Sequence, residues 1–234
     1  MLSALEVRER SAALDGADPA TTLAWAVETF PGKVALTVSF GGSGVVLAHL
    51  LSRIDRSVPV IFLDTRFHFR ETYEFKRRFV KRYGLNLLEL TPLADPGPLY
   101  KTDPDRCCFL RKVEPLERAL VAFEAWISAV RQDQSATRRT TELVEYHEVG
   151  GRPIVKIFPL AHWSRGDVWR YIREHAVPYH PLLDQGYSSI GCWPCTRPTA
   201  PGEAERAGRW SGSGKTECGL HTFTAKREGM TRER

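Results

Sequence analysis

The sequence lacks any long apolar run and any export signal. No window approaches the roughly 20 apolar residues that a membrane helix needs. Residues 1–18 mix Glu, Arg and Asp with Leu and Ala, and so lack the apolar centre of a signal peptide. We therefore expect no membrane association. The expected location is the cytoplasm, where thiols are kept reduced and disulfides are rare.

The sequence also lacks a long basic run and any recognised nucleic-acid-binding motif. Its net charge of +5 comes from 33 Lys and Arg residues against 28 Asp and Glu residues. An excess of this size is typical of a solvated basic surface or of a protein with an anionic substrate, so we expect no nucleic-acid partner. The 234 residues, 42% of them hydrophobic, are enough for one large domain with a sizeable core.

Cysteine is scarce and unevenly distributed. There are five cysteines, and Cys107 and Cys108 are adjacent, which strains a disulfide between them but lets both bind one metal centre. Cys192 and Cys195 have the Cys-x-x-Cys spacing at which two thiolates chelate a metal. Four thiolates in two such pairs predict an iron–sulfur cluster or a structural zinc. Cys218 is left over, and an odd cysteine beside charged residues is a candidate nucleophile.

Short apolar stretches bounded by turn residues predict strands, and the amphipathic stretches between them predict helices. The expected strands are residues 33–40, 58–63, 85–90, 125–131, 142–147 and 153–158. The expected helices are residues 19–30, 45–54, 71–83 and 165–175, with another that follows Cys107-Cys108 to about residue 123. This alternation predicts an α/β fold with a mainly parallel sheet and helices on both faces.

Two of the expected strands end in residues suited to a nucleotide. The strand over residues 33–40 contains Ser39 and runs into the glycine-rich turn 41–44, which leads into a helix. Strand, glycine turn and helix together direct backbone N–H groups at a phosphate, although a merely structural turn is the alternative. The next strand ends in Asp64 and Thr65, which either contact the nucleotide or cap the strand. Ligands of parallel sheets bind at the carboxyl ends of strands, so both groups are expected at one edge.

Clear periodicity is lost from Thr196 onward, and Gly, Ser, Pro and charged residues dominate residues 201–216. We therefore expect two parts. Residues 1–200 form a nucleotide-binding domain that includes the metal site, and residues 201–234 form a mobile C-terminal segment that carries Cys218.

Taken in order, the motifs resemble one family, the assimilatory adenylyl-sulfate reductases, within the wider phosphoadenylyl-sulfate reductase family. The resemblance extends from about Val34 to His221. It is carried by Ser39-Phe40-Gly41-Gly42, Leu63-Asp64-Thr65, Glu71-Thr72-Tyr73, Cys107-Cys108-x-x-Arg111-Lys112, Trp126 with Arg131 and Gln134-Ser135, Gly191-Cys192-x-x-Cys195, Glu205-Arg206-x-Gly208-Arg209-Trp210 and Glu217-Cys218-Gly219-Leu220-His221.

The resemblance implies an adenine nucleotide α-hydrolase-like fold and an enzyme of sulfate assimilation and cysteine biosynthesis. It implies that Cys218 attacks the sulfur of adenosine 5′-phosphosulfate, that AMP leaves, and that thioredoxin or a similar thiol then releases sulfite. It assigns a 4Fe–4S cluster to Cys107, Cys108, Cys192 and Cys195. The substrate-binding residues that it implies are Ser39, Gly41, Gly42, Asp64, Thr65, Lys112, Arg131, Arg206, Arg209 and His221. The positive field of these cations, with His221 nearby, is expected to lower the pKa of Cys218.

Three alternatives stay open at this point. The substrate could be the 3′-phosphorylated nucleotide, or the enzyme could use both forms. A cluster-containing ATP pyrophosphatase that thiolates tRNA would want an acidic residue in the glycine turn, and residues 41–44 offer none. A zinc-stabilised binding module leaves Cys218 without a role. The other histidines show no paired ligand spacing and are expected to be structural or exposed. Homo-oligomerisation is left open.

Overall fold

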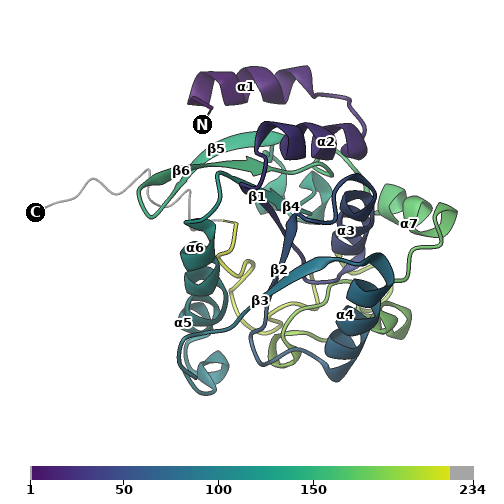
Figure 1. Ribbon diagram of the computed structural model, residues 1–234. Helices are drawn as coiled ribbons and strands as arrows, with labels where there is room; N and C mark the ends of the chain where they lie inside the picture. Colours follow the sequence, from purple (N-terminus) through teal and green to yellow (C-terminus); the bar gives the residue numbers. More distant parts are fainter. Residues whose placement is uncertain (1, 222–234) are drawn as a thin grey trace, which may run out of the picture.

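The computed structural model describes residues 2–221 and contains a six-stranded mixed sheet (Figure 1). The strand order is β3-β2-β1-β4-β6-β5, and every neighbouring pair is parallel except β5 and β6. The strands are β1 (Val34–Thr37), β2 (Pro59–Leu63), β3 (Asn86–Leu90), β4 (Ala125–Ser128), β5 (Val144–Val149) and β6 (Arg152–Ile157). The predicted mainly parallel α/β sheet is confirmed, with one antiparallel strand at its edge.

Helices cover both faces of the sheet, as predicted (Figure 1). The α-helices are α1 (Ala4–Ala13), α2 (Pro19–Thr29), α3 (Gly42–Ile54), α4 (Arg70–Tyr83), α5 (Pro104–Cys108), α6 (Glu114–Leu120) and α7 (Arg165–Glu174). A π-helical turn (Phe109–Val113) joins α5 to α6. Short 3-10 turns occur at Leu99–Lys101, Gln132–Gln134, Ala136–Arg138, Pro181–Gln185 and Trp193–Cys195. Within residues 2–221, no helix is long and apolar enough to cross a membrane.

Local sequence explains where the helices begin and end. Asp18 caps α2 by accepting hydrogen bonds from the backbone N–H groups of Ala20 (2.8 Å) and Thr21 (3.1 Å), and a proline follows it at the first helical position. Helix α4 ends at Gly84, whose φ of 62° suits glycine. Helix α1 was not predicted, because it has little apolar periodicity, but a capping box between Ser3 and Glu6 starts it.

Each face of the sheet has its own apolar core. The larger core joins the strands to the helices on one side, including α2, α3, α4 and α7. The smaller core lies on the other face, where Leu116 and Leu120 of α6 pack beside Trp126 of β4. Leu220 of the C-terminal segment packs against this smaller core, so the chain returns to the sheet late in the sequence. Figure 1 shows this yellow segment running between α6 and the strands.

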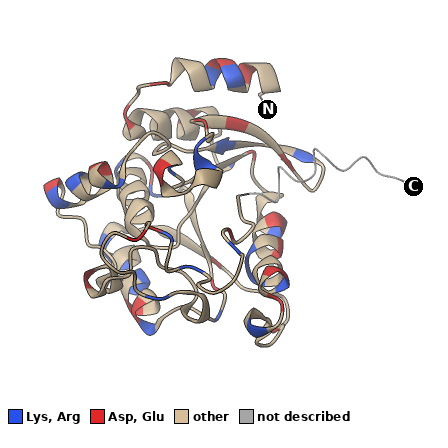
Figure 2. Cartoon of the chain, turned by 180° about the vertical axis from the view of Figure 1, so that it is seen from behind, with Lys and Arg blue, Asp and Glu red and all other residues tan. Residues whose placement is uncertain are grey.

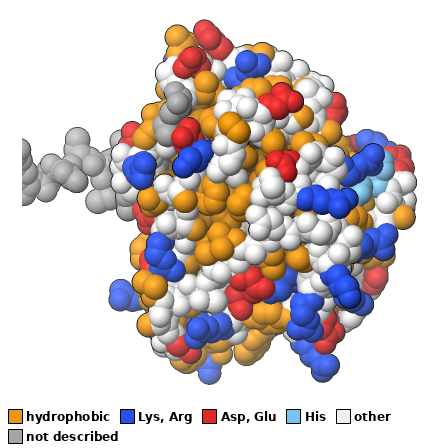
Figure 3. Space-filling view, viewed as in Figure 1, with side chains coloured by type: hydrophobic (Ala, Val, Ile, Leu, Met, Phe, Trp, Pro, Cys, Tyr) orange, Lys and Arg blue, Asp and Glu red, His pale blue; other side chains and the backbone are white. Residues whose placement is uncertain are grey.

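Charged side chains are concentrated outside these cores. Seen from behind, the outer helices carry blue and red residues, whereas the inner strands are mostly tan (Figure 2). On the face shown in Figure 3, Lys and Arg side chains are interspersed with Asp and Glu and do not form one large basic area. This distribution is typical of a solvated surface.

Candidate active site

An open cleft with a cavity volume of about 210 Å³ lies at the carboxyl ends of β1, β2 and β4. Most of the residues that the sequence predicts for a substrate site line it together. They are Ser39, Gly41, Gly42, Lys112, Arg131, Arg206, Arg209, Cys218 and His221. The cleft therefore joins the glycine turn to a cysteine far away in the sequence, as expected for ligands of a parallel sheet.

The glycine turn presents the start of α3 to the cleft. Helix α3 begins at Gly42, and its N-cap, Gly41, makes no side-chain capping hydrogen bond. The first N–H groups of a helix lack intrahelical partners and carry a partial positive charge, which suits an anionic ligand. Gly44 packs so closely on the preceding strand that an added Cβ would lie 3.1 Å from Val38 Cγ1. An alanine at position 44 would therefore require Val38 or the helix start to shift by a few tenths of an ångström.

Cys218 lies half-buried in the cleft, among groups that favour its thiolate. Burial by itself would raise the pKa of this thiol. Lys112, the backbone N–H of Leu220 and Arg209 together outweigh burial, so the pKa of Cys218 lies below its ordinary value despite the opposing charge of Glu217. The predicted direction is confirmed, and a larger thiolate fraction makes Cys218 a better nucleophile near neutral pH.

The predicted electrostatic contribution of His221 is wrong. Burial, followed by the charges of Arg138, Lys156 and Arg206, lowers the pKa of His221 well below its ordinary value. A neutral imidazole adds no positive charge. His221 instead stacks on Trp126, with ring centroids 5.6 Å apart and planes 14° apart, and its carbonyl accepts a hydrogen bond from Lys156 Nζ at 3.3 Å. These contacts hold the backbone beyond Cys218 on the sheet.

Glu217 holds the other side of Cys218. Its carboxylate accepts two hydrogen bonds from Arg138, at 2.9 and 2.8 Å, and one from Arg206 at 3.0 Å. Bidentate Arg–carboxylate pairs are directional and strong when they are poorly hydrated, and the Arg138 and Glu217 side chains are only 10% and 12% exposed. The nucleophile is thus seated between an ion-pair network and a stacked histidine. Whether residues 201–234 move remains a prediction, and residues 222–234 lie outside the described part.

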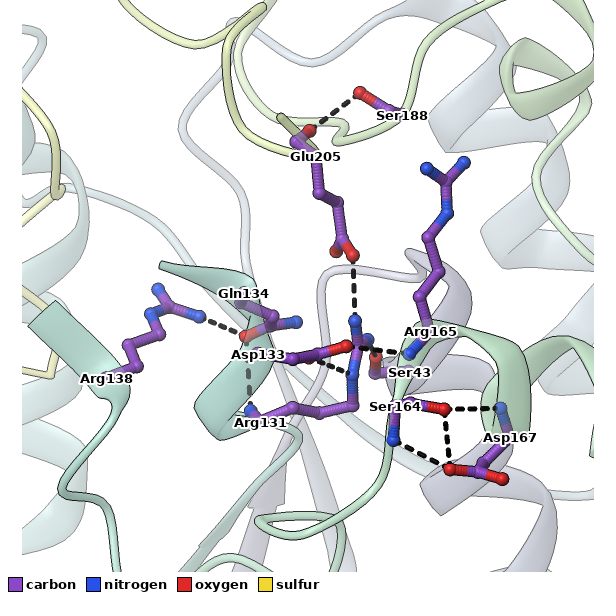
Figure 4. Close-up of polar contacts among 10 residues, drawn as sticks. All are labelled: Ser43, Arg131, Asp133, Gln134, Arg138, Ser164, Arg165, Asp167, Ser188 and Glu205. Carbon is purple, nitrogen blue, oxygen red and sulfur yellow. Dashed lines mark hydrogen bonds and ion pairs between the residues drawn. The ribbon is translucent and has the colours of Figure 1, made fainter. Parts of the chain in front are cut away.

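Arg131 lies in the cleft wall, where its guanidinium also holds neighbouring segments together (Figure 4). The guanidinium donates to Ser43 Oγ at the start of α3, to Asp133 at 2.9 Å and to Glu205 at 2.7 Å. Asp133 also accepts from the backbone N–H of Arg165, where α7 begins. Arg131 therefore links the glycine turn, the start of α7 and the C-terminal segment. Its side chain is 2% exposed, so it supports the wall, and its contact with substrate stays a prediction.

Replacing Arg131 with Met is expected to destabilise the protein by about 3 kcal/mol, because Asp133 and the largely buried Glu205 lose their cationic partner. Urea denaturation measures the loss. The matched control is Arg165→Met, since Arg165 is exposed and its side chain extends away from Asp133 (Figure 4). That control should change stability by no more than about 0.5 kcal/mol. Equal effects of the two substitutions would contradict the supporting role of Arg131.

The four predicted metal ligands meet at a second, smaller cavity. Cys107, Cys108, Cys192 and Cys195 all line it, although they come from α5 and from the distant segment 192–195. Within residues 2–221, no three His, Cys, Asp or Glu side chains converge as they do around a single metal ion. The structure thus brings the four predicted cysteines to the lining of one cavity.

Two cationic residues separate the two cavities. Lys112 and Arg209 line both the cleft and the cysteine cavity, together with Trp210. Burial raises the pKa of Cys107 and raises that of Cys108 to about 11. Metal binding would therefore have to displace protons from these thiols, and nearby cations lower the cost of holding the resulting thiolates.

Asp64 and Thr65 are predicted substrate residues that do not line the cleft. Asp64 accepts hydrogen bonds from the Tyr73 hydroxyl at 2.6 Å and from the Arg66 backbone N–H at 2.9 Å. Thr65 is fully buried, and its Oγ1 lies 3.2 Å from Cys192 Sγ. Thr65 therefore borders the cysteine cavity, and both residues keep their strand-end role in this structure.

Sequence reasoning missed other residues of the cleft. His68, which was expected to be structural or exposed, lines it and donates to the Leu63 carbonyl from Nε2 at 2.9 Å. Burial lowers the pKa of His68 to about 4, so it is neutral. Arg138 and Arg165 also line the cleft. Their proximity to it depends on the loop after β4 and on the start of α7, which no local spacing reveals.

Comparisons with known proteins agree with this arrangement. The phosphoadenosine phosphosulfate reductase domain matches residues 33–198. The adenosine 5′-phosphosulfate reductase of Halalkalibacterium halodurans is 45% identical over 226 residues, covering 93% of this chain and 97% of that protein. The Bacillus subtilis protein named adenosine 5′-phosphosulfate reductase 2 is 45% identical over 213 residues, covering 87% of this chain and 89% of that one.

A solved structure agrees as well. The phosphoadenylyl-sulfate reductase of Candida auris, crystallised as a phosphate complex, superposes with a TM-score of 0.75 at 33% identity, and the match covers 84% of this chain and 98% of that one. On these matches, the chain belongs to the phosphoadenosine phosphosulfate reductase family.

Proposed function

We propose that this protein reduces adenosine 5′-phosphosulfate to sulfite and AMP, with Cys218 as the nucleophile and thioredoxin or a similar dithiol as the reductant. The observation that carries the proposal is the position of Cys218. Its thiol faces the same cleft as the glycine turn and is accompanied by Lys112 and Arg209, which lower its pKa. Relatives at 45% identity are named for reduction of this substrate.

The first half of the reaction is a displacement at sulfur. The Cys218 thiolate attacks the sulfate sulfur, the bond from sulfur to the bridging phosphate oxygen breaks, and AMP leaves with the electron pair. Two anions must approach each other, so cations have to offset their repulsion and stabilise charge on the leaving phosphate. Lys112, Arg206 and Arg209 supply this charge from the wall next to Cys218. The N-terminus of α3 supplies N–H donors in the same cleft.

The second half restores the thiol. A thiolate of the reductant attacks Cys218 Sγ, sulfite leaves, and a mixed disulfide forms. The second thiol of the reductant then attacks this disulfide, so that Cys218 is regenerated and the reductant is oxidised by two electrons. For a protein reductant to reach Cys218, the segment around this residue must detach from the cleft. We therefore extend the proposal to residues 201–221, the described part of the predicted mobile segment, whose docking by Glu217 and His221 is reversible.

We further propose a 4Fe–4S cluster on Cys107, Cys108, Cys192 and Cys195. The proposal is supported by four thiols around one cavity, with Lys112 and Arg209 beside them. When bound, the cluster would keep the four cysteines deprotonated and join the α5 segment to the 193–195 turn. Lys112 then lies between two anionic groups, the cluster thiolates and the Cys218 thiolate, and this favours its charged form although it is buried.

Replacing Lys112 with Gln is expected to raise the pKa of Cys218, because Lys112 is the strongest of the groups that lower it. Below the pKa, the thiolate fraction falls about tenfold per pH unit. A higher pKa therefore means slower reaction at neutral pH, and alkylation of Cys218 by iodoacetamide at pH 7 should slow several-fold. Lys33→Gln, a change at an exposed lysine, is the control and should leave the alkylation rate unchanged. An unchanged alkylation rate in the Lys112→Gln variant would contradict this account.

The substrate form is tested by steady-state kinetics with thioredoxin as reductant. Sulfite release from adenosine 5′-phosphosulfate should exceed release from the 3′-phosphorylated form at equal concentration. Equal rates would establish dual specificity, and a preference for the 3′-phosphorylated form would overturn the substrate assignment. The thiolating pyrophosphatase alternative requires ATP hydrolysis with release of pyrophosphate. We expect no pyrophosphate release from ATP here.

A further inference from the structure

The loop that carries Cys192 and Cys195 also determines where the cleft arginine Arg209 can lie. The backbone N–H of Trp210 donates to the Cys195 carbonyl at 3.0 Å, and the N–H of Arg197 donates to the Gly208 carbonyl at 2.9 Å. Thr196 and Arg209 form an antiparallel bridge between these bonds. The backbone of Arg209 is therefore fixed at the C-terminal end of the cysteine loop.

The side chain of Arg209 returns to the other end of the same loop. Its guanidinium packs against the Trp210 ring, with Cζ 4.4 Å from the ring centroid, and also against the buried Gly191. A Cβ on Gly191 would lie 2.8 Å from Nη1 of Arg209 and closer still to Cζ and Nη2. Gly191 does not have a positive φ, so backbone conformation does not explain this glycine. The glycine is explained instead by the space that the guanidinium of Arg209 occupies.

Arg209 also has unused hydrogen-bonding capacity. Its buried Nε has no hydrogen-bond partner among residues 2–221. The side chain lines the cleft beside Cys218 and the cysteine cavity beside Cys195. A buried donor without a partner destabilises the folded protein unless a ligand accepts its hydrogen bond. This guanidinium is therefore available to bind an anion.

We propose that Gly191 is a positioning residue for Arg209: its bare α-carbon lets the guanidinium lie against Trp210 and face the sulfur-transfer cleft. The proposal rests on the proposed function above, because the anion that Arg209 meets is the phosphosulfate. A methyl group at position 191 displaces the guanidinium of Arg209. It meets neither the cysteine side chains nor the backbone hydrogen bonds of the loop.

The test is a double-mutant cycle of Gly191→Ala and Arg209→Ala, measured as kcat/KM for sulfite release together with bound iron per chain. Gly191→Ala alone is expected to lower kcat/KM about 10- to 100-fold, as misplacement of a charge-stabilising group does. In the Arg209→Ala background, the same substitution should change kcat/KM by less than about twofold, since the group that it displaces is gone. Iron content should stay at the wild-type level in the Gly191→Ala variant.

Gly214→Ala is the matched control, because a Cβ there meets no atom within 4 Å. It should leave kcat/KM unchanged. Losses that add in the double variant, a Gly191→Ala variant as active as wild type, or iron lost on the Gly191 substitution would each overturn the positioning role. Absence of sulfite release by the wild-type protein would instead overturn the proposed function, so the two failures are distinguishable.

Discussion

Cys218→Ser is expected to abolish sulfite formation, lowering kcat by roughly four orders of magnitude or more. A serine hydroxyl has no appreciable anionic fraction at neutral pH, so the cations that lower the pKa of Cys218 cannot make it an effective nucleophile. Binding should survive, because the glycine turn and the arginines are untouched. Sulfite release measures the first quantity, and calorimetric titration with adenosine 5′-phosphosulfate measures the second.

The control for this substitution is Ser213→Ala, in the same segment but outside the cleft lining. It should retain wild-type turnover, since Ser213 Oγ donates only to the nearby Trp210 carbonyl and accepts from Lys215 N. A Cys218→Ser protein that still releases sulfite at more than about one hundredth of the wild-type rate would exclude Cys218 as the nucleophile.

Cys192→Ser is expected to remove both the iron and the activity. Cys192 belongs to the four-thiol set around the smaller cavity, and its Sγ lies within hydrogen-bond distance of Thr65 Oγ1. Loss of one ligand from a four-cysteine site typically costs the cluster. The visible absorption of the purified protein, its iron content and its sulfite release should fall together, the last by at least about a hundredfold.

Trp193→Phe in the same loop is the control. Trp193 is 49% exposed and is not a candidate ligand, so iron and activity should be retained. A colourless wild-type protein that contains zinc would contradict the cluster assignment. A Cys192→Ser protein with full iron content would remove Cys192 from the ligand set.

The sequence predicted the framework because local patterns determine it. The strand and glycine turn before α3, the capped α2 and the amphipathic α4 depend on residues close to one another in the chain. The four paired cysteines and Cys218 were found for a similar reason, since rare residues in short motifs stand out. Their meeting at two adjacent cavities depends on α5 and on the loops that carry Cys192, Cys195 and Cys218.

What the sequence could not predict depends on distant partners. The sequence marks Arg131 as a substrate-binding candidate but does not reveal that its guanidinium also contacts Ser43, Asp133 and Glu205. His221 looks like a charged group until burial and three neighbouring cations are counted. Each of these roles is decided by burial and by side chains brought in from other elements, and no spacing along the chain records them.

The most direct test of the central claim is intact and peptide mass spectrometry of the purified protein incubated with adenosine 5′-phosphosulfate and no reductant. The account predicts that the peptide containing Cys218 gains the mass of one SO₃ group, that AMP appears in equal amount, and that thioredoxin removes the added mass with release of sulfite. An intact cluster with no added mass on that peptide, or with the mass on another cysteine, would contradict the account.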